Sequence, residues 1–343
     1  MTNYGNNWTN TSIPSVLTPG CFLSCAVSGL GQYQVALAYN SGIYVSNNYG
    51  SSWTKTGTDS VEYSQVYISY SGKYIIAKTF SSKLYKSTNS GETFSVAFAS
   101  LAPNYYFFSQ DEIYHGYISS TNRLNISSDS GSSFNIPLSI SSISMVTAAF
   151  SQTGKYQITI SSTNIYVSSD FGASFASVLG SLTGLNSCCM SLDGKYMYVN
   201  SSTNLRYSSN FGASWSISSG VSAVSNLICN YTGKYISVKT STNIYISSNF
   251  GATFSSTYSG SGINTNKMSF DGKYLMIVNN GTTNVIISKD YGQSWTTKTS
   301  GMIASPNNNN YLTPAISADG KYMLFSSNMG TINYSQYVYK SSG

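Results

Sequence analysis

The sequence predicts an all-β chain folded as a single eight-bladed β-propeller, and two repeated patterns support this prediction. The first is an octapeptide of the form S-x-[DN]-x-G-x-[ST]-[WF]. It occurs seven times, with its first residue at Ser46, Ser87, Ser127, Ser168, Ser208, Ser247 and Ser288. Successive copies lie 39 to 41 residues apart. A period near 40 residues is typical of propeller blades, each of which contains four short strands.

An eighth octapeptide is divided between the two ends of the chain. Ser341 occupies its first position, while Asn3, Gly5 and Trp8 match its third, fifth and eighth positions. We therefore expect residues 1–13 to complete the last blade together with residues 312–343, so that residues 1–343 form one ring-shaped domain. A seven-bladed ring is the alternative, and it would require one unit to lie outside the ring.

The second pattern is a Gly-Lys-Tyr turn, or a close variant, upstream of each octapeptide. Seven copies stand at 31–33, 72–74, 154–156, 194–196, 233–235, 272–274 and 320–322. The third unit has Asp111, Glu112, Ile113 and Tyr114 in the equivalent place. The residue four positions before the glycine position is always apolar: Val27, Ile68, Phe108, Phe150, Met190, Cys229, Met268 and Ile316. Each unit thus predicts an innermost strand, this turn, two further strands, the octapeptide and an outer strand.

The octapeptide resembles the Asp-box, or BNR repeat, of a family of β-propellers. The resemblance implies that each copy lies in the hairpin between the third and fourth strands of a blade. Its third residue accepts backbone hydrogen bonds, its glycine takes a left-handed conformation, and its aromatic residue packs beneath the turn. Asparagine keeps the acceptor oxygen where the family prefers aspartate. We expect a structural role for the third-position residues Asn3, Asn48, Asn89, Asp129, Asp170, Asn210, Asn249 and Asp290.

The family includes sialidases, xyloglucan-cleaving glycosidases, photosystem II assembly factors and sortilin-type receptors, so the fold does not select one function. Resemblance to a sialidase would imply three arginines that converge on the substrate carboxylate. This chain has only Arg123 and Arg206, and both stand at ordinary repeat positions. The sequence therefore excludes a sialidase.

A glycosidase of another kind needs two carboxylates that face one cleft. Nine of the eleven acidic residues lie within octapeptides or Gly-Lys-Tyr-type turns, which leaves Asp59 and Glu62. These two lie in the loop between the first and second units, and they are the candidate acid/base pair. A solvated loop is the competing interpretation, because three residues is a short separation for two carboxylates across a sugar. His115, the one histidine, aligns with Gln34, Ile75 and Met197 and is expected to be a strand residue.

A ligand surface is predicted where the eighth unit and its neighbours carry additional residues. Both the loop after Trp295 and the segment after Tyr322 are longer than their counterparts in the other units. Asn and Tyr are adaptable contact residues, and loops carry binding sites more often than strands do. The predicted ligand contacts are Asn308, Asn309, Tyr311, Met329, Tyr334 and Tyr337.

Composition narrows the classes of partner. Charged residues make up 8% of the chain, against about 25% for an average protein, and the formal net charge is +6. Six lysines stand in the repeated turns, so we predict turn chemistry and no nucleic-acid partner. The five cysteines, Cys21, Cys25, Cys188, Cys189 and Cys229, are interpreted as free thiols, with no metal site and no cofactor. Signal peptides and membrane spans are not predicted, and the location of the protein stays open.

The function that these observations favour is a non-catalytic binding or structural propeller with a protein or glycan ligand. The alternative is a glycoside hydrolase that uses Asp59 and Glu62. The composition also resembles that of repeat proteins from protists and large DNA viruses, which suggests a virion or cell-surface component. We expect a monomeric propeller or a part of a larger assembly.

Overall fold

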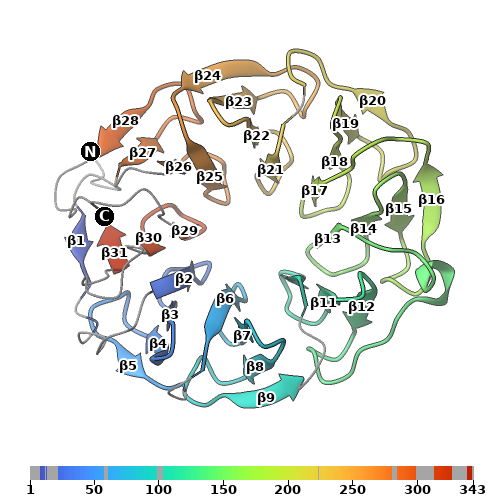
Figure 1. Cartoon of the computed structure of the whole chain (residues 1–343). Helices are drawn as coiled ribbons and strands as arrows, with labels where there is room; N and C mark the ends of the chain where they lie inside the picture. The colour runs from blue at the N-terminus through green and yellow to red at the C-terminus, as the bar shows by residue number, and fades with distance from the viewer. Residues whose placement is uncertain are drawn as a thin grey trace. The chain divides into compact units, whose positions relative to one another are not determined.

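The computed structural model describes residues 8–11, 13, 22–57, 61–98, 103–222, 224–279, 284–298, 313–326 and 338–341. These residues form eight antiparallel sheets, and the fold is the eight-bladed β-propeller that the repeats predict (Figure 1). Among them, one short 3-10 helix, η1 (Leu138–Ile140), is the only helix. The chain divides into two compact units, Met1–Ala102 with Gly260–Gly343 and Pro103–Ser259, and each unit contains four sheets. The prediction of a single domain stays a prediction.

The first unit contains the first, second, seventh and eighth blades along the chain. The first two blades are β2 (Phe22–Val27), β3 (Gln34–Ala38), β4 (Gly42–Ser46) and β5 (Thr54–Lys55), then β6 (Tyr63–Ile68), β7 (Ile75–Thr79), β8 (Leu84–Ser87) and β9 (Ser95–Phe98). The seventh blade is β25 (Ile263–Met268), β26 (Leu275–Asn279), β27 (Val285–Ser288) and β28 (Thr296–Lys298). The eighth is β29 (Thr313–Ile316), β30 (Met323–Ser326), β31 (Val338–Ser341) and β1 (Thr9–Asn10).

The second unit contains the third to sixth blades. The third is β10 (Tyr105–Phe108), β11 (His115–Ile118) and β12 (Leu124–Ser127), and the fourth is β13 (Thr147–Phe150), β14 (Gln157–Ile160), β15 (Ile165–Ser168) and β16 (Ala176–Leu179). The fifth is β17 (Ser187–Met190), β18 (Met197–Asn200), β19 (Leu205–Ser208) and β20 (Ser216–Ile217). The sixth is β21 (Asn226–Cys229), β22 (Ile236–Lys239), β23 (Asn243–Ser247) and β24 (Ser255–Ser259).

The N-terminal strand completes the eighth blade, as the divided octapeptide predicts. Thr9 and Asn10 of β1 pair with Lys340 and Tyr339 of β31 in antiparallel register. Trp8, only 3% exposed, packs edge-on against Phe325, with ring centroids 5.2 Å apart. The outer edge of the last sheet is therefore covered by a strand from the opposite end of the sequence, which removes an unpaired edge.

The third blade differs from the others in its fourth strand. Its sheet has three strands, and the outer position is reduced to one isolated bridge between Ile126 and Asn135. Helix η1 follows that bridge. Its inner turn nevertheless keeps the geometry of the other turns: Glu112 adopts a φ of 63°, and its N–H donates to the Ser109 carbonyl over 3.1 Å.

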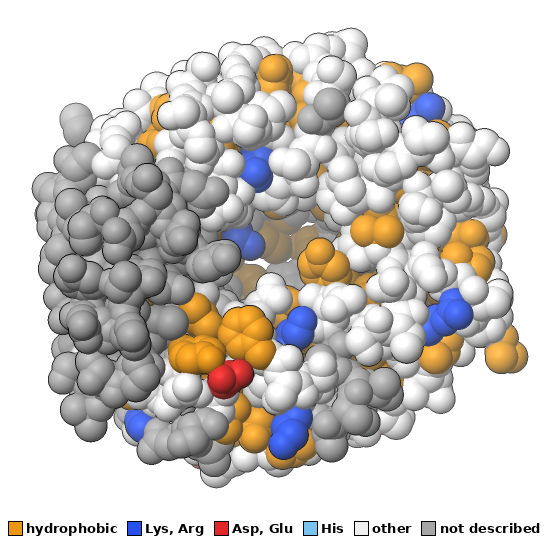
Figure 2. All heavy atoms as spheres, viewed as in Figure 1, with side chains coloured by type: hydrophobic (Ala, Val, Ile, Leu, Met, Phe, Trp, Pro, Cys, Tyr) orange, Lys and Arg blue, Asp and Glu red, His pale blue; other side chains and the backbone are white. Residues whose placement is uncertain are grey.

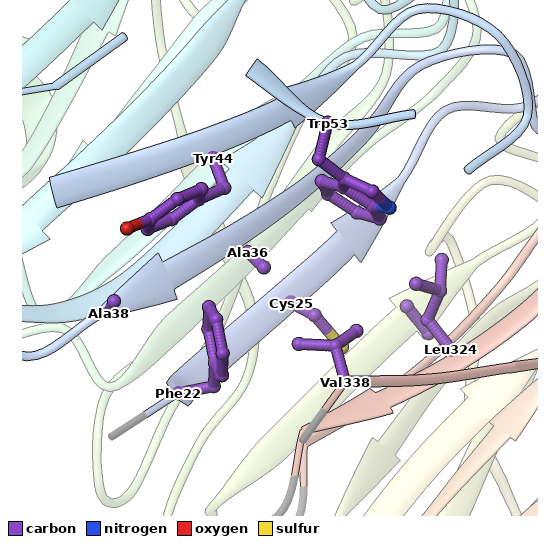
Figure 3. Packing of buried hydrophobic residues seen from close by; sticks show 9 residues of the cluster. Phe22, Cys25, Ala36, Ala38, Tyr44, Trp53, Leu324 and Val338 are labelled. Atoms are coloured by element: carbon purple, nitrogen blue, oxygen red, sulfur yellow. The ribbon is translucent and has the colours of Figure 1, made fainter. Parts of the chain in front are cut away.

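The core consists of hydrophobic clusters, each shared by two neighbouring blades of one unit. Figure 3 shows the cluster between the first and eighth blades, where Phe22, Tyr44 and Trp53 face Leu324 and Val338. The second and third strands of a blade are buried along nearly their whole length, as in β3 and β4, because a neighbouring blade covers each face. Of the eight apolar residues predicted at the ends of the innermost strands, Met190 is buried and the other seven are half-buried.

Backbone hydrogen bonds also join the inner turns of neighbouring blades. In the first unit, Phe270 N–H donates to the Ala318 carbonyl, Ala318 to Gly29, and Gly29 to Tyr70, over 2.7 to 2.8 Å. The second unit has the same arrangement from Asp111 to Gln152, Leu192 and Tyr231, over 2.7 to 3.0 Å. Except at Asp111, each donor follows a buried serine whose hydroxyl accepts the N–H of the turn tyrosine, for example Ser191 from Tyr196 at 2.9 Å.

Candidate functional site

The octapeptide hairpins are held by a repeated set of side-chain hydrogen bonds. In the fourth blade, the buried Ser168 hydroxyl donates to Asp170 Oδ1 over 2.7 Å and accepts the Gly172 N–H over 2.9 Å. Asp170 Oδ1 also accepts the Ser174 N–H over 3.0 Å. The first serine and the third-position residue make the equivalent contact in every other described octapeptide: Asn48, Asn89, Asp129, Asn210, Asn249 and Asp290.

Two consecutive residues of each hairpin adopt left-handed backbone conformations. In the fourth blade these are Phe171, with φ of 62°, and Gly172, with φ of 82°. The sequence pattern predicts only the glycine. The fourth position is Tyr, Ser or Phe, residue types for which a positive φ is uncommon, and the hydrogen bonds from the first serine hold the turn in this conformation.

The three aspartates of this motif have lowered pKa values. At Asp129, hydrogen bonds from Ser127 and Ser133 hold the pKa well below its usual range. At Asp170, burial acts to raise the pKa, but the hydrogen bonds from Ser174 and Ser168 outweigh it and the pKa is lowered. Asp290 behaves in the same way. These carboxylates are therefore kept ionised by their own turns, which is unlike a general acid.

Within each unit, the tyrosine of a repeated turn packs into the next blade. The Tyr156 ring lies against Gly194 of the fifth blade, where an added Cβ would come within 2.7 Å of the ring. The same ring packs against Phe211 of the fifth octapeptide, with centroids 4.6 Å apart and the planes tilted by 30°. Stacked pairs join Tyr322 to Tyr49, Tyr114 to Phe171 and Tyr196 to Phe250 in the corresponding places. The turn and the octapeptide thus form one inter-blade contact, and the glycine leaves space for the ring.

The aspartates of the inner turns are also held locally. Asp193 accepts the Ser191 hydroxyl over 2.6 Å and the Lys195 N–H over 3.0 Å. Corresponding bonds occur at Asp111, Asp271 and Asp319, and Asp319 also pairs with Lys321 over 3.5 Å. The described aspartates therefore all have turn contacts.

Glu62 is different, because it lies in a surface cluster with two aromatic side chains. Its Oε1 accepts the Tyr39 hydroxyl over 2.6 Å, and the Tyr39 ring meets Phe80 edge-on, with centroids 6.2 Å apart. Phe80 is 60% exposed, Glu62 is exposed and Tyr39 is half-buried. On the face in Figure 2, hydrophobic side chains gather beside an acidic side chain, whereas most other charged side chains in view are basic. We call Tyr39, Glu62 and Phe80 the aromatic–carboxylate cluster.

Backbone hydrogen bonds fix the loop that carries Glu62. The Phe80 N–H donates to the Glu62 carbonyl over 2.9 Å, and the Asn40 N–H donates to the Val61 carbonyl over 3.2 Å. The segment before β6 is thus bound to the β3–β4 loop on one side and to the β7–β8 loop on the other. The backbone segments that carry the cluster are therefore hydrogen-bonded to one another, and they come from two neighbouring blades of one unit.

Sequence reasoning singled out Glu62 but missed its two aromatic neighbours. A signal for them exists in the repeat: both stand six residues after the tyrosine of their inner turn. Units three to six have serine there, namely Ser120, Ser162, Ser202 and Ser241. The hydroxyl that caps the turn stands one residue earlier, as when Thr79 accepts the Lys83 N–H over 2.9 Å and Ser161 the Asn164 N–H over 3.0 Å.

The other predicted site residues lie outside the described part of the chain. These are Asp59 of the candidate acid/base pair, Asn3 of the divided octapeptide, and the predicted ligand contacts Asn308, Asn309, Tyr311, Met329, Tyr334 and Tyr337. Of the candidate pair, the structure therefore places only Glu62.

His115 lies fully buried on β11, as the alignment with strand residues predicts. Its Nε2 contacts the Glu112 carbonyl at 3.2 Å and must donate there, so its Nδ1 accepts the Tyr106 hydroxyl at 3.0 Å. Gln34 and Gln157 use the same repeat position to donate from Nε2 to the turn carbonyl three residues earlier. The histidine thus replaces a structural glutamine.

The described cysteines Cys25, Cys188, Cys189 and Cys229 are free thiols. Burial raises the pKa of Cys25 to about 12, and burial also raises the pKa values of Cys188 and Cys189. Cys188 and Cys189 pack into different inter-blade clusters, since successive strand residues point to opposite faces. Within the described residues, no group of three or more His, Cys, Asp or Glu side chains could hold a metal ion. No described helix is long and apolar enough to cross a membrane.

Three solved structures are similar to this chain in fold. The C-terminal WD40 domain of Sif2 has a TM-score of 0.71 at 10% identity, with 96% of this chain and 98% of that domain covered. YCF48 from Cyanidioschyzon merolae has a TM-score of 0.58 at 12% identity, with 98% of each chain covered. A structure of YCF48 bound to D1 peptide has a TM-score of 0.54 at 10% identity, with 98% of this chain and 97% of that one covered.

At these identities the likeness establishes the fold alone, which is the β-propeller. The sequence matches no protein-family model and no curated protein. Function must therefore be argued from the side chains.

Proposed function

We propose that this chain is a non-catalytic binding module, a β-propeller of the Asp-box type whose ligand is a segment of another protein. The observation that carries the proposal is the aromatic–carboxylate cluster. It exposes a large apolar ring and a carboxylate on a fixed backbone, and partly exposed aromatic side chains are the residue type most enriched at protein interfaces.

The Asp-box assignment is supported by the hairpin geometry. Serine in the first position, an acceptor oxygen in the third and a left-handed glycine in the fifth act together in all seven described copies. Every one of these contacts closes its own turn. We therefore propose a structural role for the octapeptides, including the copy that contains Asn3.

A binding role is favoured over glycoside hydrolysis by the state of the carboxylates. The described aspartates are engaged in turns, and Glu62 is held by the Tyr39 hydroxyl. A hydrolase would have to pair Glu62 with Asp59, which lies only three residues away in sequence.

A protein ligand is favoured by a fold neighbour, YCF48, one structure of which holds a D1 peptide. The longer segments of the eighth unit, with Asn308, Asn309, Tyr311, Met329, Tyr334 and Tyr337, are proposed as additional contacts. A glycan ligand and a virion or cell-surface location remain predictions from sequence.

The proposal is tested by presenting the full-length chain with a phage-displayed library of random linear dodecapeptides and, in parallel, with a glycan array. We expect peptides to be selected, and we expect Phe80→Ala to weaken their binding by about tenfold or more, as truncation of an aromatic anchor does. Leu138→Ala is the matched control, because Leu138 is 90% exposed and distant in sequence. Glycans bound without any selected peptide, or turnover of sialosides or β-glucans that Asp59→Asn with Glu62→Gln abolishes, would overturn the proposal.

A further inference from the structure

The aromatic–carboxylate cluster places two large rings where the repeat has a small polar residue. Six residues after the tyrosine of the inner turn, units three to six have Ser120, Ser162, Ser202 and Ser241. Tyr39 and Phe80 stand at this position in two adjacent blades, and in the second blade the turn is capped by the preceding residue, Thr79, which accepts the Lys83 N–H over 2.9 Å. The Phe80 ring is 60% exposed and has no part in closing its turn, so this position is a candidate functional position.

The geometry of the cluster is suited to a cation. Tyr39 holds Glu62 Oε1 over 2.6 Å, and among the described residues Glu62 has no other side-chain partner. The second oxygen is therefore available on the solvent side, next to the exposed Phe80 ring. A carboxylate provides a full negative charge and an aromatic face a partial one, so both attract a basic group and both disfavour an anion.

Cation–aromatic contacts are already used elsewhere in this fold. Lysine ammonium groups lie 5.0 to 5.5 Å from tyrosine ring centroids at the repeated turns, for example Lys195 over Tyr196. In those contacts both the lysine and the tyrosine belong to this chain. The cluster instead presents an aromatic ring, with a carboxylate beside it, to solvent. It does so on a chain whose formal net charge is +6, where a local acidic site is distinctive.

We propose that the cluster of Tyr39, Glu62 and Phe80 recognises a lysine or arginine side chain of the peptide segment that the propeller binds. The inference rests on the proposed function and adds the chemistry of the ligand. The basic group pairs with the free oxygen of Glu62 and its aliphatic stem or guanidinium plane covers Phe80. Tyr39 is a positioning residue, since its hydroxyl orients the carboxylate.

The experiment uses the full-length chain and the peptides selected from the dodecapeptide library. Each selected peptide is resynthesised with its basic residues replaced singly by neutral analogues, citrulline for arginine and N-acetyl-lysine for lysine. We expect one replacement to weaken binding about tenfold, and Glu62→Gln to weaken binding of the parent peptide by a similar factor. In a double-mutant cycle, Glu62→Gln should then have little effect on the neutral peptide.

Glu92→Gln is the matched control, because Glu92 is an exposed carboxylate outside the cluster and should leave the affinity unchanged. Tyr39→Phe keeps the ring but frees the carboxylate, and we expect a smaller loss that is more sensitive to salt. Melting temperatures of all variants should match that of the parent chain.

Failure of this inference can be distinguished from failure of the proposed function. Selected peptides that bind equally well with every basic residue neutralised, or an unchanged affinity in Glu62→Gln, would overturn basic-residue recognition and leave peptide binding intact. If the library yields no peptide, both are overturned.

Discussion

The hairpins at 168–175 and 208–215 differ in two residues, and they show what the octapeptide requires. The first reads SSDFGASF and the second SSNFGASW. Both have left-handed residues at the fourth and fifth positions, with φ of 62° and 82° in one and 58° and 84° in the other. Both are closed by the same serine, whose hydroxyl accepts the glycine N–H over 2.9 Å.

The difference lies in the second polar atom of the third residue. Asp170 Oδ2 accepts the Ser174 hydroxyl over 2.5 Å, whereas Asn210 Nδ2 donates to the Ser214 hydroxyl over 2.9 Å. A hydroxyl can act as donor or acceptor, so it satisfies either partner. One acceptor oxygen is therefore enough to form the turn. A carboxylate adds a negative charge, so the stability of a hairpin with aspartate should depend on pH and that of a hairpin with asparagine should not.

The largest expected effect is at the glycine that both hairpins share. Gly172→Val places a β-branched residue at a φ of 82°, and its Cβ would meet Gln157 Oε1 and Ile126 Cδ1 at 2.7 Å. We expect a loss of roughly 1 to 3 kcal/mol in the free energy of unfolding, measured by urea denaturation. Gly212→Val should lose a comparable amount. Loss of ligand binding at unchanged stability would contradict a structural role.

The next largest losses of stability are expected in Ser168→Ala and Ser208→Ala. Each removes the buried hydroxyl that accepts a glycine N–H, and an unsatisfied buried donor costs about 1 to 2 kcal/mol. The loss should be larger at Ser168, because its hydroxyl also donates to a charged carboxylate, and such bonds are stronger than neutral ones. Equal losses, measured by the same denaturation, would show that the charge adds nothing to this bond.

The repeat explains why so much of the fold could be predicted from sequence. Blade number and strand order depend on local patterns with a fixed period, and even the degenerate turn at Glu112 keeps its predicted place and backbone conformation. The buried serines of the inner turns, such as Ser191, escaped notice because a serine in a serine-rich chain carries little signal.

The candidate site could be predicted only in part. Glu62 stood out because it has no repeat role, but its partners come from loops 23 residues before it and 18 residues after it in sequence. Contact between such loops depends on how two blades pack. The third blade's missing outer strand was equally hidden, since its octapeptide at 127–134 is intact.

The dependence of stability on low pH should distinguish hairpins with aspartate in the third position from hairpins with asparagine there. The folded pKa values of Asp129, Asp170 and Asp290 are lowered relative to the unfolded value of about 3.9. Each therefore contributes stability above about pH 4 that is lost as the pH falls toward the folded pKa. We expect the melting temperature to fall with pH in this range, and the fall to be smaller when all three are replaced by asparagine. An unchanged acid response in the triple variant would show that other groups cause it.

The smallest expected change in stability comes from exchanging the third-position residues of the two hairpins, measured at neutral pH. In Asp170→Asn the acceptor oxygen remains for the Ser168 hydroxyl and the Ser174 N–H, and the new amide can donate to the Ser174 hydroxyl as Asn210 does to Ser214. Asn210→Asp makes the reverse change. Because both positions are exposed, we expect each variant to lie within about 0.5 kcal/mol of the parent at pH 7. Below pH 4 the two should diverge, with Asp170→Asn losing less stability than the parent and Asn210→Asp losing more. A loss above 1 kcal/mol in Asp170→Asn at pH 7 would mean that the carboxylate, and not the acceptor oxygen alone, holds that hairpin.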